Sequence, residues 1–412
     1  MNIPQHLVSR DRSQYDGPVH TEQPMLTLVG LLRHQQPLMQ MTGDGWAAVI
    51  RAARKHHVLS HLSQSLQQLE IELPFIAARR LLRARQQDAA SVLSTLLALK
   101  ELLGIMASAG IRAVPLKGPV LLERLFGDAA IRPCQDIDLL IHPDEIDLAE
   151  NVLRGLGYRS MAPKPSLTRD WIRHGVMVEL HVHPHHRCYF DAPITSIWKR
   201  VRQAKFQGQP IGLLAPADEL ISLCVHAACH RYDRLSMTVE LAVAFEVLGH
   251  HVGSCLPDGY KAESVSGIIQ LGYAMVERLN GTPAIRESLP IELHPEVKGR
   301  AIPLSQRIWL SVLSESSPKH IEWELLRLLL QLEPTLTGKL RPCCAHLPII
   351  LSRVTQRDNE LASSLGLRDH GAALLIRQIR LVWMLSNLVG QRLQAVFLVC
   401  YTLVRVKGER MQ

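Results

Sequence analysis

Apolar and polar positions follow three successive patterns along this chain. The first part, up to about residue 110, is rich in Leu, Ala, Arg and Gln, which favours helix, and one long helix is predicted from Pro74 to Gly110. The middle part mixes short apolar runs with turn residues, and the last part favours helix again. The regions expected are a polar tail over 1–25, an N-terminal helical region over 26–110, a mixed core over 111–216, a helical region packing on that core over 217–300, and a C-terminal helical region over 301–412.

This order predicts an α+β fold, a small mixed-sheet core flanked by N-terminal and C-terminal helical regions. An apolar run over Ile111–Leu116 predicts a short strand that stops at Lys117-Gly118, before a helical run over Val120–Phe126. The alternating run Val176–Val182 predicts a strand as well. Further predicted elements are a helix over 144–156 and a hairpin over 205–214.

Two carboxylates stand one residue apart in the apolar run DIDLLI. On a strand, Asp136 and Asp138 point to the same face, while Ile137 and Leu139 point to the other. Like charges held side by side in apolar surroundings repel, and a divalent metal relieves that repulsion. Mg²⁺ is commonly held by one or two carboxylates and substrate phosphates, so the pair indicates phosphoryl or nucleotidyl transfer. The alternative is an ordinary solvated face of a half-exposed strand.

The segment before these carboxylates suits a polyphosphate. Glycine permits close approach of the backbone to a ligand, a helix N-terminus favours anions, and Lys117 adds a cation beside Gly118. Alternation over Val176–Val182 places Glu179 and His181 on one face. If that strand lies beside the Asp136–Asp138 strand, Glu179 completes a cluster of three carboxylates.

The motifs LKG, R-x-x-x-DIDLLI, a Gly-Tyr after an acidic helix, and VELH follow one another in this order. Together with LAPADELISLCVHAACHRYDRL, they give residues 114–245 a resemblance to an uncharacterised bacterial nucleotidyltransferase family. That family is part of the superfamily that includes DNA polymerase beta and the kanamycin-type antibiotic nucleotidyltransferases. The resemblance implies transfer of a nucleoside monophosphate from an NTP, expected to be ATP, to an acceptor hydroxyl with Mg²⁺ or Mn²⁺.

The resemblance also assigns roles to single residues. It implies that Asp136 and Asp138 are the metal-binding pair and that Glu179 is the third catalytic carboxylate. Lys117-Gly118 stands where the wider superfamily has Gly-Ser, so a hydroxyl that would contact phosphate is absent. Lys117 can compensate for it electrostatically. A second departure is Glu240, which follows RLSMTV, where the family pattern leads us to expect aspartate.

Arginine and histidine side chains extend the predicted site. Arg132 suits polyphosphate oxygens, and the alternative is a surface salt bridge. His181 is a candidate nucleotide-binding residue, whereas the neighbouring histidines of HVHPHH are read as a polar loop, with structural zinc as a minor alternative. His226 and His230 share one helix face. The resemblance implies that this face lines the active-site cleft through Asp218 and His226. The alternative is that each is an ordinary core or interface histidine.

Composition limits the kinds of molecule that this protein is expected to bind. A formal net charge of +8 suits an anionic partner such as an NTP, a nucleic acid or an acidic membrane surface. Nucleic acid is unlikely as a partner because basic and aromatic residues are not interleaved. The eight cysteines form no C-x-x-C pair, and the polar N-terminus has no apolar signal-peptide core, so we expect a cytoplasmic protein.

The C-terminal segment 371–412 is apolar but carries six basic residues and one acid, a net charge of +5. Such a helix can lie on an anionic membrane surface or on a partner, and the alternative is a helix that closes the core. Two functions therefore stand beside catalysis. One is a non-catalytic nucleotidyltransferase-like scaffold, and the other is a membrane-surface adaptor in polysaccharide or secondary-metabolite assembly.

Overall fold

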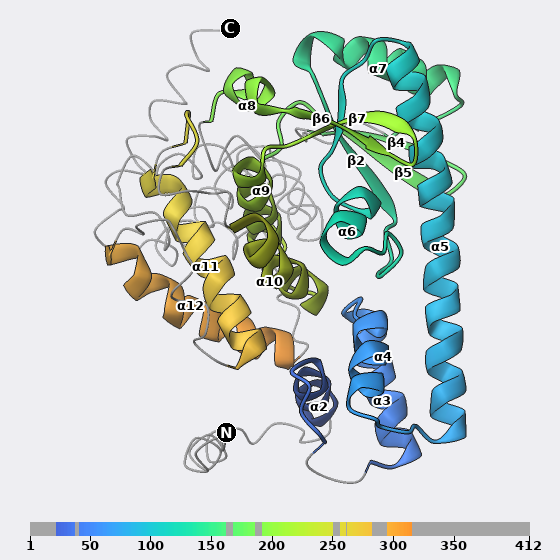
Figure 1. Ribbon diagram of the computed structural model, residues 1–412, viewed down its shortest axis with the longest axis vertical. Coiled ribbons are helices and arrows are strands. Elements are labelled where there is room, and N and C mark those ends of the chain that lie inside the picture. Colours follow the sequence, from blue (N-terminus) through green and yellow to red (C-terminus); the bar gives the residue numbers. More distant parts are fainter. Residues whose placement is uncertain are drawn as a thin grey trace, which may run out of the picture. The chain divides into compact units, whose positions relative to one another are not determined.

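The computed structural model describes residues 22–37, 41–161, 168–185, 192–249, 256–260, 262–281 and 295–314. The chain divides into two compact units, 1–338 and 339–412, and every described residue belongs to the first. The predictions for residues 1–21 and for the basic segment 371–412 lie outside the described residues. Within the described part, helices surround a mixed sheet, which confirms the expected α+β class (Figure 1).

The sheet has five strands in the order β1-β2-β5-β4-β3. Their bounds are β1 Ala113–Pro115, β2 Asp136–Ile141, β3 Arg159–Ser160, β4 Thr168–Arg173 and β5 Val176–His181. The strands β2 and β5 are parallel neighbours, and the other pairings are antiparallel. The predicted strand of residues 176–182 therefore does lie beside the strand that carries Asp136 and Asp138.

One face of this sheet is an apolar core. Residues at alternate positions of β2 and β5, such as Ile137, Leu139, Val178 and Leu180, are buried there against α5 (Phe75–Ser108) and α7 (Ile146–Gly155). The helix α5 runs along the sheet, as Figure 1 shows, and matches the long helix predicted from the sequence. Among the described residues, α5 is also the one helix that could cross a membrane by length and composition.

Short elements connect the strands. They are α6 (Pro119–Phe126), the 3-10 turn η1 (Pro143–Glu145) and α8 (Ile194–Arg200). The predicted hairpin is confirmed as β6 (Arg202–Phe206) paired with β7 (Gln209–Leu213). The helix predicted over 144–156 begins two residues later, as α7, because residues 143–145 form the tighter 3-10 turn.

Helices make up the remaining described segments. Before the sheet are α2 (Glu22–Leu32), α3 (Gly43–Lys55) and α4 (Leu59–Gln68), and after it are α9 (Pro216–Cys229), α10 (Leu235–Gly249), α11 (Ala262–Asn280) and α12 (Pro295–Leu313). The helices α9, α10 and α11 pack against one another, and α10 also contacts α6. The expected polar tail to residue 25 is too long, because α2 begins at Glu22 and Met25 is buried.

Candidate active site

Alternation along β2 and β5 gathers the polar side chains on the face opposite the apolar core. In the register, Asp136 is paired with Met177 and Asp138 with Glu179. His181 lies two positions after Glu179 and therefore on the same face. The structure thus brings together the four side chains that the sequence placed on these two strands: Asp136, Asp138, Glu179 and His181.

Asp138 is the centre of this cluster, with a relative exposure of 3%. Its Oδ2 lies 3.1 Å from Nζ of Lys117, and its Oδ1 lies 2.9 Å from Nε2 of His181. The same His181 nitrogen is 3.6 Å from Oε2 of Glu179. One ligand atom each from Asp138, Glu179 and His181 lies within 4.8 Å of the others, so these three side chains can hold a metal ion.

The turn before α6 directs Lys117 toward these acids. Gly118 has φ 74° and ψ −148°, a backbone conformation that essentially only glycine adopts. Pro119 then occupies the first turn of α6, where its missing N–H costs nothing. The backbone N–H of Leu116 donates to the carbonyl oxygen of Asp138, which ties the start of the turn to β2. The Lys-Gly turn is therefore attached directly to the strand of the acidic pair.

The charges in the cluster shift one another's pKa values. Burial raises the pKa of Asp136, and repulsion from Asp138 raises it further. Burial would also raise the pKa of Asp138, but Lys117 and His181 outweigh it and hold this pKa well below its usual range. Burial lowers the pKa of His181, yet its hydrogen bonds with Asp138 and Glu179 raise it to about 9. Two cations are therefore held by an excess of carboxylates.

A further carboxylate, Asp170, was missed from the sequence. It is the register partner of Glu179 on β4, so a ladder of three acids crosses Asp138, Glu179 and Asp170. The Oδ1 atom of Asp170 is buried and has no hydrogen-bond partner among the described residues. Its strand, TRDWIR, alternates around the buried Trp171, which is the signal that could have found it.

Arg132 is paired with an acid from the helical region. Its guanidinium donates hydrogen bonds to both carboxylate oxygens of Glu240 on α10, and Nη2 is 3.1 Å from Oε2. Burial would lower the pKa of Arg132, but Glu240 raises it above its ordinary value. The alternative of a surface salt bridge is wrong, because only 16% of the Arg132 side chain is exposed. Its contact with a nucleotide stays a prediction.

The histidines after β5 are not a solvated polar loop, which corrects that prediction for two of them. His183 and His185 are both buried. The ring nitrogens of His183 lie 2.8 Å from the carbonyl oxygen of His185 and 2.9 Å from that of Ala192. His186 lies outside the described residues. These histidines therefore anchor the chain that leaves β5.

The helix α9 brings two other histidines close to the cluster. The rings of His226 and His230 are 4.5 Å apart. Burial, followed by the charge of Lys117, lowers the pKa of both residues, which keeps them neutral. Asp218 does not join them, because both of its carboxylate oxygens accept hydrogen bonds from Arg200 at 2.8 Å.

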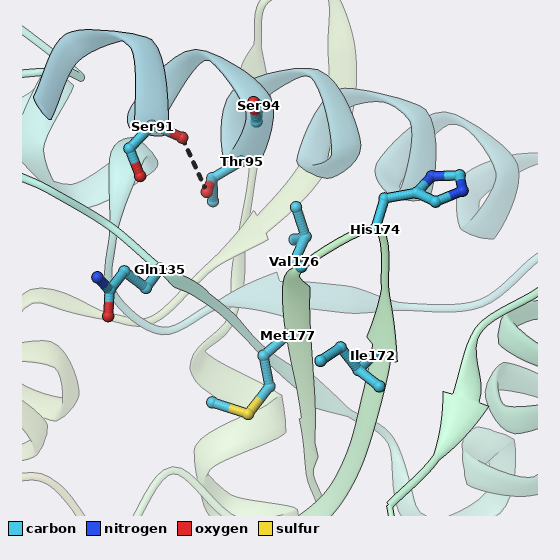
Figure 2. A pocket seen from close by; sticks show the side chains of 9 residues that line it. Ser91, Ser94, Thr95, Gln135, Ile172, His174, Val176 and Met177 are labelled. Carbon is cyan, nitrogen blue, oxygen red and sulfur yellow. Dashed lines mark hydrogen bonds between the residues drawn. The ribbon is translucent and has the colours of Figure 1, made fainter. Parts of the chain in front are cut away.

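A pocket of about 480 Å³ opens at the end of the sheet where β2 begins. Figure 2 shows hydroxyl side chains of α5 on one side of it and side chains of β4 and β5 on the other. It is lined by Ser91, Ser94, Thr95, Gln135, Ile172, His174, Gly175, Val176 and Met177. Gln135 directly precedes Asp136, and Met177 is the register partner of Asp136. The pocket therefore lies at the end of the sheet at which Asp136 begins β2.

The carboxylates lie on adjacent strands of a mixed sheet, beside a glycine turn and a helix N-terminus. This arrangement is consistent with a nucleotidyltransferase fold. The model of a family described as uncharacterised nucleotidyltransferase matches residues 42–251, about half of the chain. The chain belongs to this family, which confirms the resemblance. Comparisons with curated proteins and with solved structures find no match.

Proposed function

We propose that this protein transfers a nucleoside monophosphate from an NTP, with ATP as the first candidate, to a hydroxyl of a small molecule, sugar or protein. The observation that carries the proposal is the register of β2 and β5, which sets Glu179 directly beside Asp138 and two residues from Asp136. Asp136, Asp138 and Glu179 would hold Mg²⁺ or Mn²⁺. When bound, such an ion neutralises phosphate charge and aligns the attacking and leaving oxygens.

Lys117 and the start of α6 would bind the triphosphate. The free N–H groups of the first helical turn attract anions, and Gly118 lets the phosphates approach the backbone. Nζ of Lys117 is 3.1 Å from Oδ2 of Asp138. A divalent cation held by the carboxylates would leave Lys117 free to pair with a phosphate oxygen instead. This exchange would supply the contact that the missing serine makes elsewhere in the superfamily.

The acceptor would enter from the pocket beside Asp136. Hydroxyl and amide side chains that line a pocket are suited to hydrogen bonds with an acceptor that carries hydroxyl groups. In the reaction, the acceptor oxygen forms a bond to the α-phosphorus, the bond from that phosphorus to the bridging oxygen breaks, and pyrophosphate leaves. Glu179 and Asp170 are register partners on the sheet. One of these two carboxylates would take up the acceptor proton.

The test is transfer of radiolabelled α-phosphate from each NTP, with Mg²⁺ or Mn²⁺ and a cell lysate as the source of acceptors. A double variant, Asp136→Asn with Asp138→Asn, is compared with Asp144→Asn. Asp144 is a matched control because its side chain is 86% exposed and lies in the turn after the same strand. Label transfer that is lost in the double variant and kept in the control supports the proposal, and the labelled product reveals the acceptor class.

A non-catalytic scaffold is the second candidate. It is favoured by the partners of Asp138, because Lys117 and His181 pair with its two carboxylate oxygens. No label transfer, together with no metal-dependent binding of any NTP, would decide for the scaffold.

A further inference from the structure

We propose that His181 is a direct ligand of the metal, and that the site therefore prefers a divalent transition-metal ion such as Mn²⁺ to Mg²⁺. This inference deepens the proposed function and rests on it. It assigns to His181 a role other than nucleotide binding, and it assigns to the metal a chemical class.

The distances fit ligands that share one ion. Neighbouring ligands of an octahedral ion with bonds of about 2.1 Å are roughly 3 Å apart. Nε2 of His181 lies 2.9 Å from Oδ1 of Asp138 and 3.6 Å from Oε2 of Glu179. Asp136 is outside the group of three ligand atoms within 4.8 Å, although it lies on the same face. The tightest ligand set therefore contains one nitrogen and two carboxylates.

The chain on both sides holds the imidazole in this position. His181 is the last residue of β5 and is paired with Leu140 of β2. Two residues later, the buried His183 is fixed between the carbonyl groups of His185 and Ala192. These attachments fix the backbone from which the His181 ring reaches the acids. Such preorganisation is what a ligand requires, because a bound metal restricts its donors to a narrow geometry.

The donor set decides which metal is preferred. Mg²⁺ strongly favours oxygen ligands, whereas imidazole nitrogen suits transition-metal ions. Mn²⁺ accepts carboxylates and nitrogen together, so a site of Asp138, Glu179 and His181 suits it better than Mg²⁺. A histidine that only donated a hydrogen bond to Asp138 would give no such preference.

The experiment uses the full-length, tag-free, metal-free protein and Mn²⁺ alone as the probe. Electron spin-echo measurements on the bound Mn²⁺ detect the coupling of a directly bound imidazole nitrogen. Wild type is compared with His181→Gln and with His226→Gln, the variant of a neighbouring neutral histidine on α9. We expect the nitrogen coupling in wild type and in His226→Gln and its loss in His181→Gln, with Mn²⁺ affinity about tenfold lower in the latter.

A third variant, His181→Asp, keeps a donor but replaces nitrogen with oxygen. It should bind Mn²⁺ without nitrogen coupling, and Mg²⁺ should displace that Mn²⁺ at a lower concentration than in wild type. This variant tests the inference even if His181→Gln does not fold.

Each other result overturns the inference. Mn²⁺ bound without nitrogen coupling in wild type would show an all-oxygen site and would leave the proposed transfer reaction standing. Coupling that disappears in His226→Gln would assign the ligand to α9. An absence of Mn²⁺ binding would remove the ligand role, and the label-transfer assay would then decide the proposed function separately.

Discussion

Two sets of partly buried charges in this molecule differ in their balance. In the acidic cluster on β2, β4 and β5, the four carboxylates Asp136, Asp138, Asp170 and Glu179 face two cations, Lys117 and His181. In the second set, three arginines of the mixed core each pair with one carboxylate of α9 or α10. The pairs of this second set are Arg124–Glu219, Arg132–Glu240 and Arg200–Asp218.

This difference in charge balance distinguishes a candidate binding site from ion pairs that hold two parts of the fold together. Arg132–Glu240 and Arg200–Asp218 each have two hydrogen bonds, which satisfy the charges of the pair internally and join the core to the helices that follow it. An excess of carboxylates leaves charge that a further cation or a bound proton can neutralise. Ion pairs therefore indicate function through their imbalance rather than through their number.

The largest expected effect comes from Glu179→Gln. Loss of a metal ligand removes several kcal/mol of transition-state stabilisation, so label transfer should fall on the order of a thousandfold. The free energy of unfolding of the metal-free protein should stay the same or rise, because one of the like charges is gone. Urea unfolding measures this second quantity, and a large loss of stability would show that the cluster is a structural pair like the others.

Glu240→Gln should have the opposite effect. Removing one partner of a buried ion pair leaves Arg132 with an uncompensated charge, so the free energy of unfolding should fall by about 3–5 kcal/mol. Thermal and urea unfolding check this prediction. A double variant, Arg132→Met with Glu240→Leu, should recover most of the loss. If Glu240→Gln instead abolishes transfer at unchanged stability, the pair belongs to the active site.

The metal-free cluster should also give a pH dependence. The pKa of His181 is raised to about 9 in the folded protein, above the value of about 6.5 for an unperturbed histidine. Its stabilisation is therefore fully present below pH 6.5 and is lost as the pH rises through about 9, by up to about 3 kcal/mol. Urea unfolding with a chelator, from pH 6 to 9.5, should show this decline in wild type. The decline in the free energy of unfolding should be weaker in His181→Gln. Parallel stability curves for wild type and His181→Gln would contradict the prediction.

The smallest effects concern two glycines. Gly118→Ala forces a side chain into a conformation that costs about 1–3 kcal/mol, and it should weaken NTP binding because Lys117 is displaced from the acids. Gly155→Ala is the matched control, since this helical glycine has open space around its Cβ position. It should stabilise the protein by up to about 1 kcal/mol. Equal effects of both substitutions would show that the Lys-Gly turn has no special role.

The sequence was sufficient for features that depend on neighbouring residues. Alternation in DIDLLI and VMVELH placed the acids and His181 on one face, and the Lys-Gly step predicted the turn before α6. Even the adjacency of β2 and β5 could be inferred, because clustered acids on two strands suggest a shared site. Family membership agrees with that inference.

Only the tertiary structure decided which distant groups meet. Asp170 joins the acids because β4 pairs with β5 in one particular register, and Glu240 neutralises Arg132 because α10 packs beside the core. His183 is held in a buried position because the carbonyl oxygen of Ala192, nine residues away, accepts a hydrogen bond from its ring Nε2. Strand periodicity is a property of a few consecutive residues, and one sequence expresses it directly. A partner across the fold depends on the packing of whole elements, and no short stretch of sequence determines that packing.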